Sequence, residues 1–198
     1  LFEAIKKNCV EDKKILEGFN NPNYRNEYKM ISNNPIYYEV KFSYEIPGIE
    51  EFDESLVKGV LKDYENKIKE ISYDILASKV LEELISNKEM DKYVIKIDKG
   101  LKKAGLLRLF DNKYLKEFVK ILVPYEEEIK YQNLIKDYKE IGMSFIYKYD
   151  SNENVNPTMF VNDMELLVNK EFINNNLDNQ ISFDKMNIKL VVKNKEEE

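Results

Sequence analysis

The sequence of 198 residues contains no histidine and no tryptophan, and it has a single cysteine. Without histidine, the chain cannot form a Ser-His-Asp or Cys-His catalytic pair, an imidazole metal site or a histidine pH switch. With one cysteine, it cannot form an internal disulfide, a zinc–cysteine cluster or a cysteine-ligated iron–sulfur centre. Only six glycines are present, and none belongs to a glycine-rich phosphate-binding loop. These absences leave carboxylate- and lysine-based chemistry, and they favour a non-enzymatic protein without a cofactor.

Positive charge is carried almost entirely by lysine. The chain has 29 lysines but only 2 arginines, and acidic residues outnumber basic ones by 37 to 31. Because acids are in excess in both halves of the chain, we expect no broad nucleic-acid-binding footprint. Lysine and the 22 asparagines have AT-rich codons, so we expect a bacterial source with an AT-rich genome. Codon usage therefore explains much of the lysine content.

The length and composition suit a single α+β domain over residues 1–198, because 43% of the residues are hydrophobic and can form one core. No apolar run reaches the ~20 residues that a membrane span needs. The chain begins at Leu1 in place of methionine, so we expect it to be excised from a longer chain, from which a tag, a signal, a membrane anchor or a preceding domain has been removed. This expectation favours an extracytoplasmic location.

The clearest strand pattern runs from Tyr38 to Ile46, where apolar residues alternate with polar ones. A period of two means that one face of the strand is buried and the other is hydrated. Shorter patterns of the same kind occupy 93–97, 143–149 and 188–192. One-sided burial favours a mostly antiparallel sheet, here of four to five strands.

Two amphipathic helices are expected to pack on this sheet. The longer covers about 55–87, where apolar residues recur at steps of three and four, and the second covers about 126–141 and ends at Gly142. Shorter helices are predicted over 114–123 and, from a capping box formed by Asn162 and Glu165, up to about residue 173.

One strand motif carries possible chemistry. Glu39 and Lys41 stand two residues apart and so share one face of a strand. This Glu-x-Lys resembles the second half of the PD-(D/E)xK nuclease core, and the resemblance implies a divalent cation held by two carboxylates, with the lysine beside the attacking water. Glu27 is the only carboxylate upstream that can serve as the first acid. The alternative is a polar sheet face on which glutamate and lysine are cross-strand neighbours.

A second motif concerns a metal. Asp150, Asn152 and Asn154 match the first three ligand positions of a calcium loop. The sixth position is Val155 where that loop needs glycine, and the twelfth is Val161 where it needs glutamate. The spacing therefore indicates a hairpin turn more than a calcium site.

The remaining feature is tyrosine, with 14 copies. Tyr37 is expected on the hydrated face of its strand, where it can form part of a recognition surface. We predict a non-enzymatic binding or regulatory module that acts through a protein partner or a small ligand. It would be an extracytoplasmic domain or, alternatively, an acidic intracellular immunity or inhibitor protein. A metal-dependent nuclease using Glu27, Glu39 and Lys41 is the other alternative.

Overall fold

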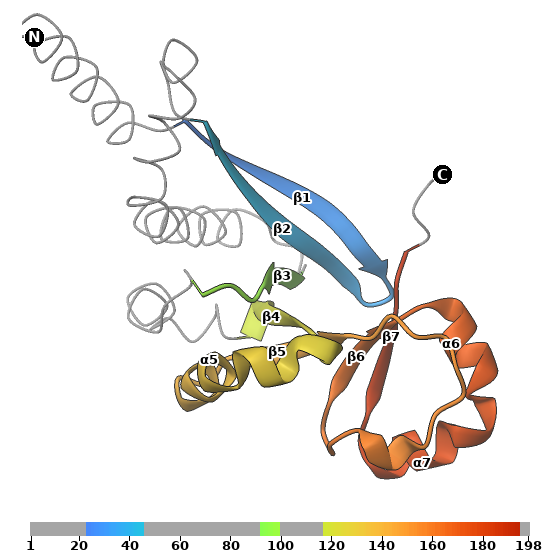
Figure 1. Ribbon diagram of the computed structural model, residues 1–198. Helices are drawn as coiled ribbons and strands as arrows, with labels where there is room; N and C mark the ends of the chain where they lie inside the picture. Colours follow the sequence, from blue (N-terminus) through green and yellow to red (C-terminus); the bar gives the residue numbers. More distant parts are fainter. Residues whose placement is uncertain (1–22, 46–91, 100–116, 195–198) are drawn as a thin grey trace, which may run out of the picture.

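The computed structural model describes residues 23–45, 92–99 and 117–194. These ranges form a seven-stranded sheet in which spatial order follows chain order. The strands are β1 (Asn23–Asn33), β2 (Ile36–Glu45), β3 (Lys92–Lys96), β4 (Val119–Pro124), β5 (Ser144–Lys148), β6 (Glu165–Val168) and β7 (Lys189–Val192). β1 and β2 form a long antiparallel hairpin, whereas each later strand runs parallel to the one before it. The sheet curls into a half-barrel (Figure 1).

This architecture corrects the predicted sheet. A mostly antiparallel sheet of four to five strands is wrong, because the described residues form a mixed sheet of seven strands that is mostly parallel. The prediction relied on the alternation in β2, which indicated one hydrated face. In the curled sheet, part of that polar face lines an internal cavity, as Glu39 does. A strand with one face on a polar cavity therefore carries the same alternation as a strand with one face in bulk water, whichever way its neighbours run.

Short helices connect the later strands. The longest described helix is α5 (Glu128–Glu140), which follows the 3-10 turn η2 (Tyr125–Glu127) and matches the helix predicted over 126–141. Gly142 has a positive φ of 82° just after it, which explains the stop at a glycine. The remaining helical segments are η3 (Pro157–Met159), α6 (Lys170–Asn175), η4 (Leu177–Asn179) and α7 (Gln180–Lys185).

Two local predictions are wrong, and one lies outside the described ranges. Residues 119–123, the described end of the helix predicted over 114–123, belong to β4, and Glu165, predicted in the first turn of a helix, begins β6. Both segments are short apolar runs, for which periodicity does not separate a buried strand from a helix. The long helix predicted over 55–87 falls on residues that are not described. Within the described ranges, no helix has the length and apolar character to cross a membrane.

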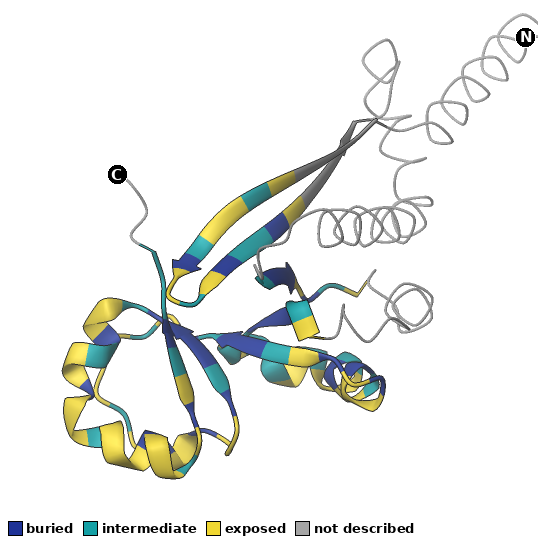
Figure 2. Cartoon of the chain, turned by 180° about the vertical axis from the view of Figure 1, so that it is seen from behind, coloured by how far each residue is buried: buried dark blue, intermediate teal, exposed yellow. Residues whose placement is uncertain are grey.

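The parallel strands are buried on both faces. Side chains on the outer face pack against α5 and the α6–α7 segment, where Tyr138, Phe172 and Phe183 are fully buried. The inner face holds a smaller apolar layer, here called the inner core. Its members are Tyr37, Val94, Leu122, Ile146, Leu167 and Val191. Figure 2 shows the dark, buried strands between the exposed outer faces of the helices.

Charged residues lie on both sides of the inner core because residues two apart share a strand face. Lys92, Lys120, Glu165 and Lys189 each precede an inner-core residue by two positions and lie toward the amino ends of the strands. Lys96, Lys148, Asn169 and Lys193 each follow one by two positions and lie at the carboxyl ends. The inner face is thus an apolar layer between two polar layers.

The two edges of the sheet meet at one point. The backbone N–H of Asn194, just after β7, donates to the carbonyl of Ile31 in β1 at 2.9 Å, and its side-chain amide donates to the carbonyl of Met30 at 3.4 Å. The β1–β2 pairing has an irregularity between Met30 and Ser32 at the same place. This bulge at Ile31 lets β1 turn toward β7.

Candidate functional site

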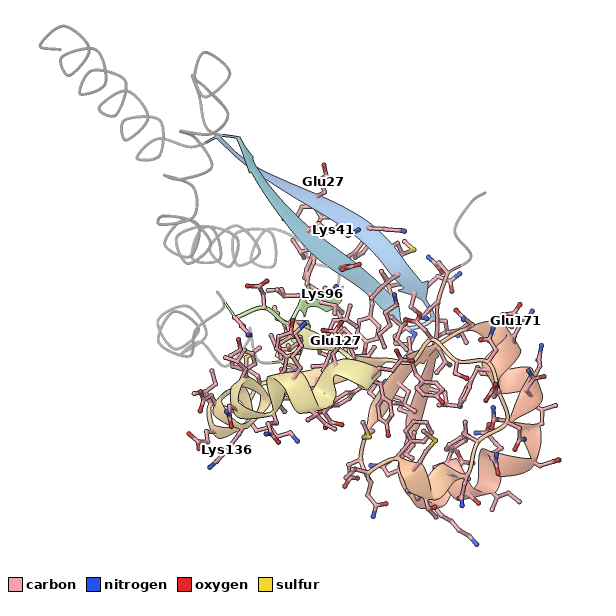
Figure 3. The ribbon with its side chains drawn as sticks, viewed as in Figure 1. Glu27, Lys41, Lys96, Glu127, Lys136 and Glu171 are labelled. Atoms are coloured by element: carbon pink, nitrogen blue, oxygen red, sulfur yellow. The ribbon has the colours of Figure 1, made fainter. Side chains whose placement is uncertain are left out.

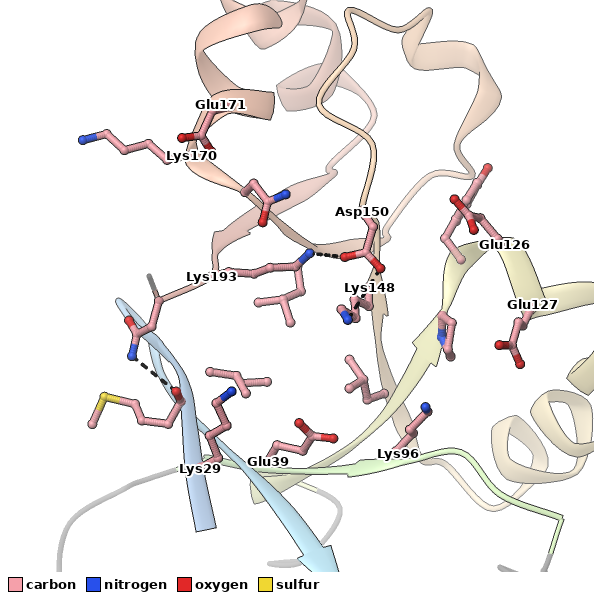
Figure 4. A pocket seen from close by; sticks show the side chains of 18 residues that line it. Lys29, Glu39, Lys96, Glu126, Glu127, Lys148, Asp150, Lys170, Glu171 and Lys193 are labelled. Carbon is pink, nitrogen blue, oxygen red and sulfur yellow. Dashed lines mark hydrogen bonds and ion pairs between the residues drawn. The ribbon is translucent and has the colours of Figure 1, made fainter. Parts of the chain in front are cut away.

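A cavity of about 670 Å³ opens at the carboxyl ends of the parallel strands (Figure 4). Its apolar part comes from the inner core, through Leu122 and Leu167, and from Ile31 on β1. Residues from β1 and β2 form one side, and the ends of β3 to β7, the turn η2 and the start of α6 form the rest. In α/β sheets, ligands bind just beyond the carboxyl ends of the strands, so the cavity is in the expected place for a site.

Among the described residues, ten charged side chains line this cavity, five of each sign. The basic ones are Lys29, Lys96, Lys148, Lys170 and Lys193, and the acidic ones are Glu39, Glu126, Glu127, Asp150 and Glu171. Lys96 and Lys148 are the last residues of β3 and β5, and Lys193 directly follows β7. Three alternate strands therefore each bring one lysine to the same layer of the cavity wall.

Asp150 joins two of these lysines. Its carboxylate accepts a hydrogen bond from Nζ of Lys193 and lies 3.5 Å from Nζ of Lys148. Lys193 also donates to the carbonyl of Tyr149 at 3.4 Å. The Lys193 side chain is only 16% exposed, so Asp150 supplies the counter-charge for a mostly buried amine. This ion pair connects the carboxyl end of β5 with the carboxyl end of β7.

The charges around Asp150 change its acidity. Partial burial raises the pKa of its carboxyl, but the hydrogen bond from Lys193 and the charges of Lys193 and Lys148 outweigh burial and hold the pKa below its usual value. Asp150 therefore stays ionised in the folded protein, and one negative charge faces two lysines. The strand ends keep an excess of positive charge toward the cavity.

The helical side of the cavity is acidic. Glu126 and Glu127 belong to η2, immediately after β4, and Glu171 is in α6, after β6. Lys130 of α5 donates to Glu127 at 2.9 Å, and this hydrogen bond, with the nearby charge of Lys96, lowers the pKa of the Glu127 carboxyl. Glu126 and Glu171 are exposed.

A second charged cluster lies at the amino ends of the strands, on the other side of the inner core. The hydroxyl of Tyr37 and the amine of Lys120 each donate to a different oxygen of Glu165. Lys189 lies 3.9 Å from the same carboxylate. The side chains of Lys120 and Glu165 are only 12% and 11% exposed, so this cluster joins β2, β4, β6 and β7 from within the curl of the sheet.

Tyr37 has a different place from the one predicted. It is fully buried, so the exposed recognition surface expected there is wrong. Burial raises the pKa of its hydroxyl strongly, and the hydrogen bond to Glu165 and that residue's charge act in the same direction. Nζ of Lys120 lies 5.5 Å from the centre of its ring. Burial also lowers the pKa of Lys92, as do the charges of Lys120 and Lys189.

The structure brings the predicted nuclease residues onto one face of the β1–β2 hairpin (Figure 3). Glu27 pairs with Lys41 across the two strands, and Lys29 pairs with Glu39. This alternation of opposite charges is typical of cross-strand ion pairs. Of the three predicted residues, Glu39 lines the cavity, whereas Glu27 and Lys41 are exposed. The described ranges contain no group of three carboxylate or thiol side chains suited to a metal ion. A nuclease role stays an untested prediction.

The three candidate calcium ligands are engaged by other groups. Asp150 pairs with two lysines, as described above. The side-chain oxygen of Asn152 accepts from Asn169 at 2.9 Å, and the amide of Asn154 donates to the carbonyl of Asn175 at 2.6 Å. These contacts attach the loop after β5 to α6. The hairpin turn predicted here is wrong, because β5 and the following strand β6 run parallel. The weaker alternative of a calcium site stays untested.

The cavity lysines were missed in the sequence, although a signal for them exists. Lys96 and Lys148 lie within predicted strands, and Lys193 directly follows one. Had those strands been predicted as parallel, their ends would have been expected to converge at one edge. Three lysines placed there would then have marked a site. The error in strand direction therefore hid the site.

Comparison with known proteins gives little guidance. No protein-family model matches the sequence, and no curated protein matches it. Among solved structures, the chain is similar to the S helix-GGDEF-EAL part of Vibrio cholerae LapD bound to c-di-GMP, with 13% identity and a TM-score of 0.42. The match covers 93% of this chain and 49% of that one, so the chain spans about half of its length. Similarity at this level assigns neither a family nor a function.

Proposed function

We propose that this chain is a non-enzymatic regulatory module that binds a small polar ligand in the cavity at the strand ends. The observation that carries the proposal is the convergence of Lys96, Lys148 and Lys193 on one cavity of about 670 Å³. That volume lies within the range of roughly 300–1,000 Å³ that is usual for small-molecule sites. The charged lining suits a polar ligand, because each buried charge needs a partner once water is displaced.

Binding without catalysis is favoured by the state of the charged groups. The sequence has no histidine, and the carboxylate of Asp150 is already held by Lys193 and Lys148. A general acid or base needs a pKa close to the working pH, and the pKa of Asp150 is shifted away from it. The charged groups of the cavity are therefore suited to bind a ligand and not to transfer its protons.

The regulatory role rests on where the cavity lies. Met30 and Ile31 on one sheet edge and Lys193 and Asn194 on the other all line it. Asn194 joins the two edges by its hydrogen bonds to the carbonyls of Met30 and Ile31, and Lys193 is its neighbour in the chain. A ligand that contacts both edges stabilises their junction and so ties the β1–β2 hairpin to the rest of the sheet. Ligand binding would thereby favour the conformation in which the hairpin is joined to β7.

The test is a thermal-shift screen of the full chain against amino acids, dipeptides, dicarboxylates, sugar phosphates and nucleotides, followed by calorimetric titration of the hits. A ligand that binds only the folded state raises the melting temperature. We expect Lys96→Gln to weaken binding about tenfold, the loss of one charged hydrogen bond. Lys185→Gln, at an exposed lysine of α7 outside the cavity, is the matched control.

Two results would contradict the proposal. One is a screen in which no compound raises the melting temperature. The other is a hit whose affinity is the same in Lys96→Gln and Lys185→Gln. Chemical conversion of a hit during incubation, followed by NMR, would show an enzyme in place of a binding module.

A further inference from the structure

The charged cluster at the amino ends of the strands contains more positive than negative groups. Its charged members in the described ranges are Lys92 of β3, Lys120 of β4, Lys189 of β7, Glu165 of β6 and Glu117, which is exposed just before β4. The lysines and Glu165 each precede an inner-core residue by two positions, so they share one layer inside the curl of the sheet. Three lysines against two glutamates leave one positive charge in excess.

The carboxylate of Glu165 is already used within the cluster. One of its oxygens accepts from the hydroxyl of Tyr37, and the other accepts from the amine of Lys120. Lys189 lies 3.9 Å from the oxygen that Tyr37 contacts, which is beyond the length of a hydrogen bond. The Lys189 side chain is 54% exposed, so its amine can turn to another acceptor.

Lys92 is incompletely compensated. Its amine lies 6.0 Å from the centre of the Tyr37 ring, and the amine of Lys120 lies 5.5 Å from the same centre. Glu165 and Glu117 act on Lys92 through their charges and not through a hydrogen bond. Burial and the charges of Lys120 and Lys189 outweigh these two acids and lower the pKa of the Lys92 amine. A further negative charge beside Lys92 would therefore be favourable.

We propose that Lys92 and Lys189 form an anion-binding site for a small oxyanion with two negative charges, of the sulfate or phosphate type. Each ammonium group has three donors and no fixed plane, so the two amines can donate to different oxygens of a tetrahedral anion. The paired Lys120 and Glu165 form the floor of the site. Because β4, β5 and β6 lie between β3 and β7 in the sheet, the bound anion connects two strands across the curl.

This site goes beyond the proposed function. It lies at the opposite ends of the strands from the cavity, and none of Lys92, Lys120, Glu165 and Lys189 lines that cavity. The two sites therefore depend on different lysines, and each can be tested without the other.

The experiment uses sulfate as the probe, because sulfate stays a dianion throughout the pH range in which proteins are folded. Calorimetry on the full chain measures the dissociation constant, and melting temperatures are compared in sulfate and in chloride at equal ionic strength. Sulfate stabilises folded proteins in general through its exclusion from their surface. That general effect is common to all variants, so the site is measured by the part of the shift that a variant removes.

Lys92→Gln and Lys189→Gln should each weaken sulfate binding about tenfold, because each removes a charge-assisted hydrogen bond. Lys185→Gln makes the same change of charge at an exposed lysine of α7 and should leave binding unchanged. In chloride, Lys92→Gln should not lower the free energy of unfolding, because it removes a positive charge that its surroundings disfavour. Loss of binding without loss of stability distinguishes a ligand contact from a structural one.

The pH dependence provides a second readout. The affinity for sulfate should fall as the pH rises through the lowered pKa of Lys92, because a neutral amine no longer attracts the anion. Tyr37 stays neutral over this range, since its pKa is strongly raised. The fall should therefore begin at a lower pH in the wild type than in Lys92→Gln. Identical pH profiles would contradict the assignment of Lys92 to the site.

Two further results would overturn the inference. One is a dissociation constant that is the same in the wild type, Lys92→Gln and Lys189→Gln. The other is sulfate binding that is weakened by Lys96→Gln and not by Lys92→Gln, which would place the anion in the cavity. Neither result contradicts the ligand-binding function of the cavity, whose test depends on Lys96.

Discussion

Lys193 donates a hydrogen bond to the carboxylate of Asp150, a residue 43 positions earlier in the chain. The contact joins the ends of β5 and β7, between which β6 lies. Three neighbouring parallel strands are thus connected at their carboxyl ends by a charged pair in addition to the backbone ladder. The pair also forms part of the cavity wall, so the stability of the sheet and the shape of the site depend on the same residues.

Replacement of Asp150 by asparagine should lower the free energy of unfolding by about 1 kcal/mol, as expected for a partly exposed pair. The Asp150 side chain is 57% exposed, and water screens part of the interaction. Urea unfolding near neutral pH measures the change. Glu153→Gln, at a nearby exposed acid, should have no measurable effect, and equal losses in the two variants would argue against the ion pair.

The same pair predicts a dependence on pH. The folded-state pKa of Asp150 is lowered, whereas the unfolded-state pKa is about 3.9. Its contribution is therefore fully present above the unfolded-state value and is lost as the pH falls through the folded-state value. The difference in unfolding free energy between the wild type and Asp150→Asn should be constant near neutral pH and should shrink below about pH 4. A difference that grows on acidification would contradict this.

Much of the strand pattern could be predicted from the sequence, but strand direction could not. The strands at 93–97, 143–149 and 188–192 were predicted within a residue or two of β3, β5 and β7. Alternation reports which side chains are buried and says nothing about which neighbour a strand pairs with. The inner polar positions, such as Glu39, face a cavity and therefore look in sequence like positions that face water. The hairpin partner β1 was missed because asparagines and charged residues interrupt its apolar positions.

The buried cluster around Glu165 predicts a larger effect on stability. Replacement of Glu165 by leucine should cost about 3 kcal/mol, because it leaves the mostly buried amine of Lys120 without its counter-charge. Addition of Lys120→Met should restore much of the loss, since a buried site of this kind tolerates an apolar pair of similar volume in place of the ion pair. Lys189→Gln, at an exposed lysine 3.9 Å from Glu165, should change stability by less than about 0.5 kcal/mol.

Thermal and urea unfolding of the wild type, Glu165→Leu, the double variant and Lys189→Gln distinguishes an effect of the ion pair from an effect of packing alone. If packing alone mattered, the double variant would be at least as unstable as Glu165→Leu. Recovery in the double variant supports the ion pair, and its absence contradicts it.

Alkaline titration should detect the raised pKa of the Tyr147 hydroxyl. This residue is almost fully buried in β5. Burial and the charge of Glu128 raise its pKa to about 12, compared with about 10 in an unfolded chain. A raised folded-state pKa contributes stability that is present below the unfolded value and is lost as the pH rises through the folded value. Above about pH 10, the wild type should therefore lose stability more steeply than Tyr147→Phe. Tyr131→Phe, on α5, controls for the loss of a hydroxyl.

Asn176 forms the centre of the asparagine contacts between the loop after β5 and the α6–α7 segment. It is 2% exposed, and its side-chain amide donates to the carbonyls of Glu153 and Phe172 at 2.9 and 2.8 Å. Its side-chain oxygen accepts from the backbone N–H of Val155 at 2.9 Å and from Asn179 at 3.0 Å. One side chain thus satisfies four partners in a place with little access to water.

Asn176→Ala should lower the free energy of unfolding by about 3 kcal/mol, because it leaves several buried polar groups without partners. Asn176→Asp should be at least as damaging, since a carboxylate would face the two carbonyl oxygens that the amide now satisfies. Asn174→Ala, at an exposed asparagine of α6 two residues earlier, is the control and should change stability by less than about 0.5 kcal/mol. Urea unfolding measures all three. A similar, small loss for Asn176→Ala and Asn174→Ala would show that the asparagines of this segment reflect codon usage alone, and a large difference would show that this one is selected for its contacts.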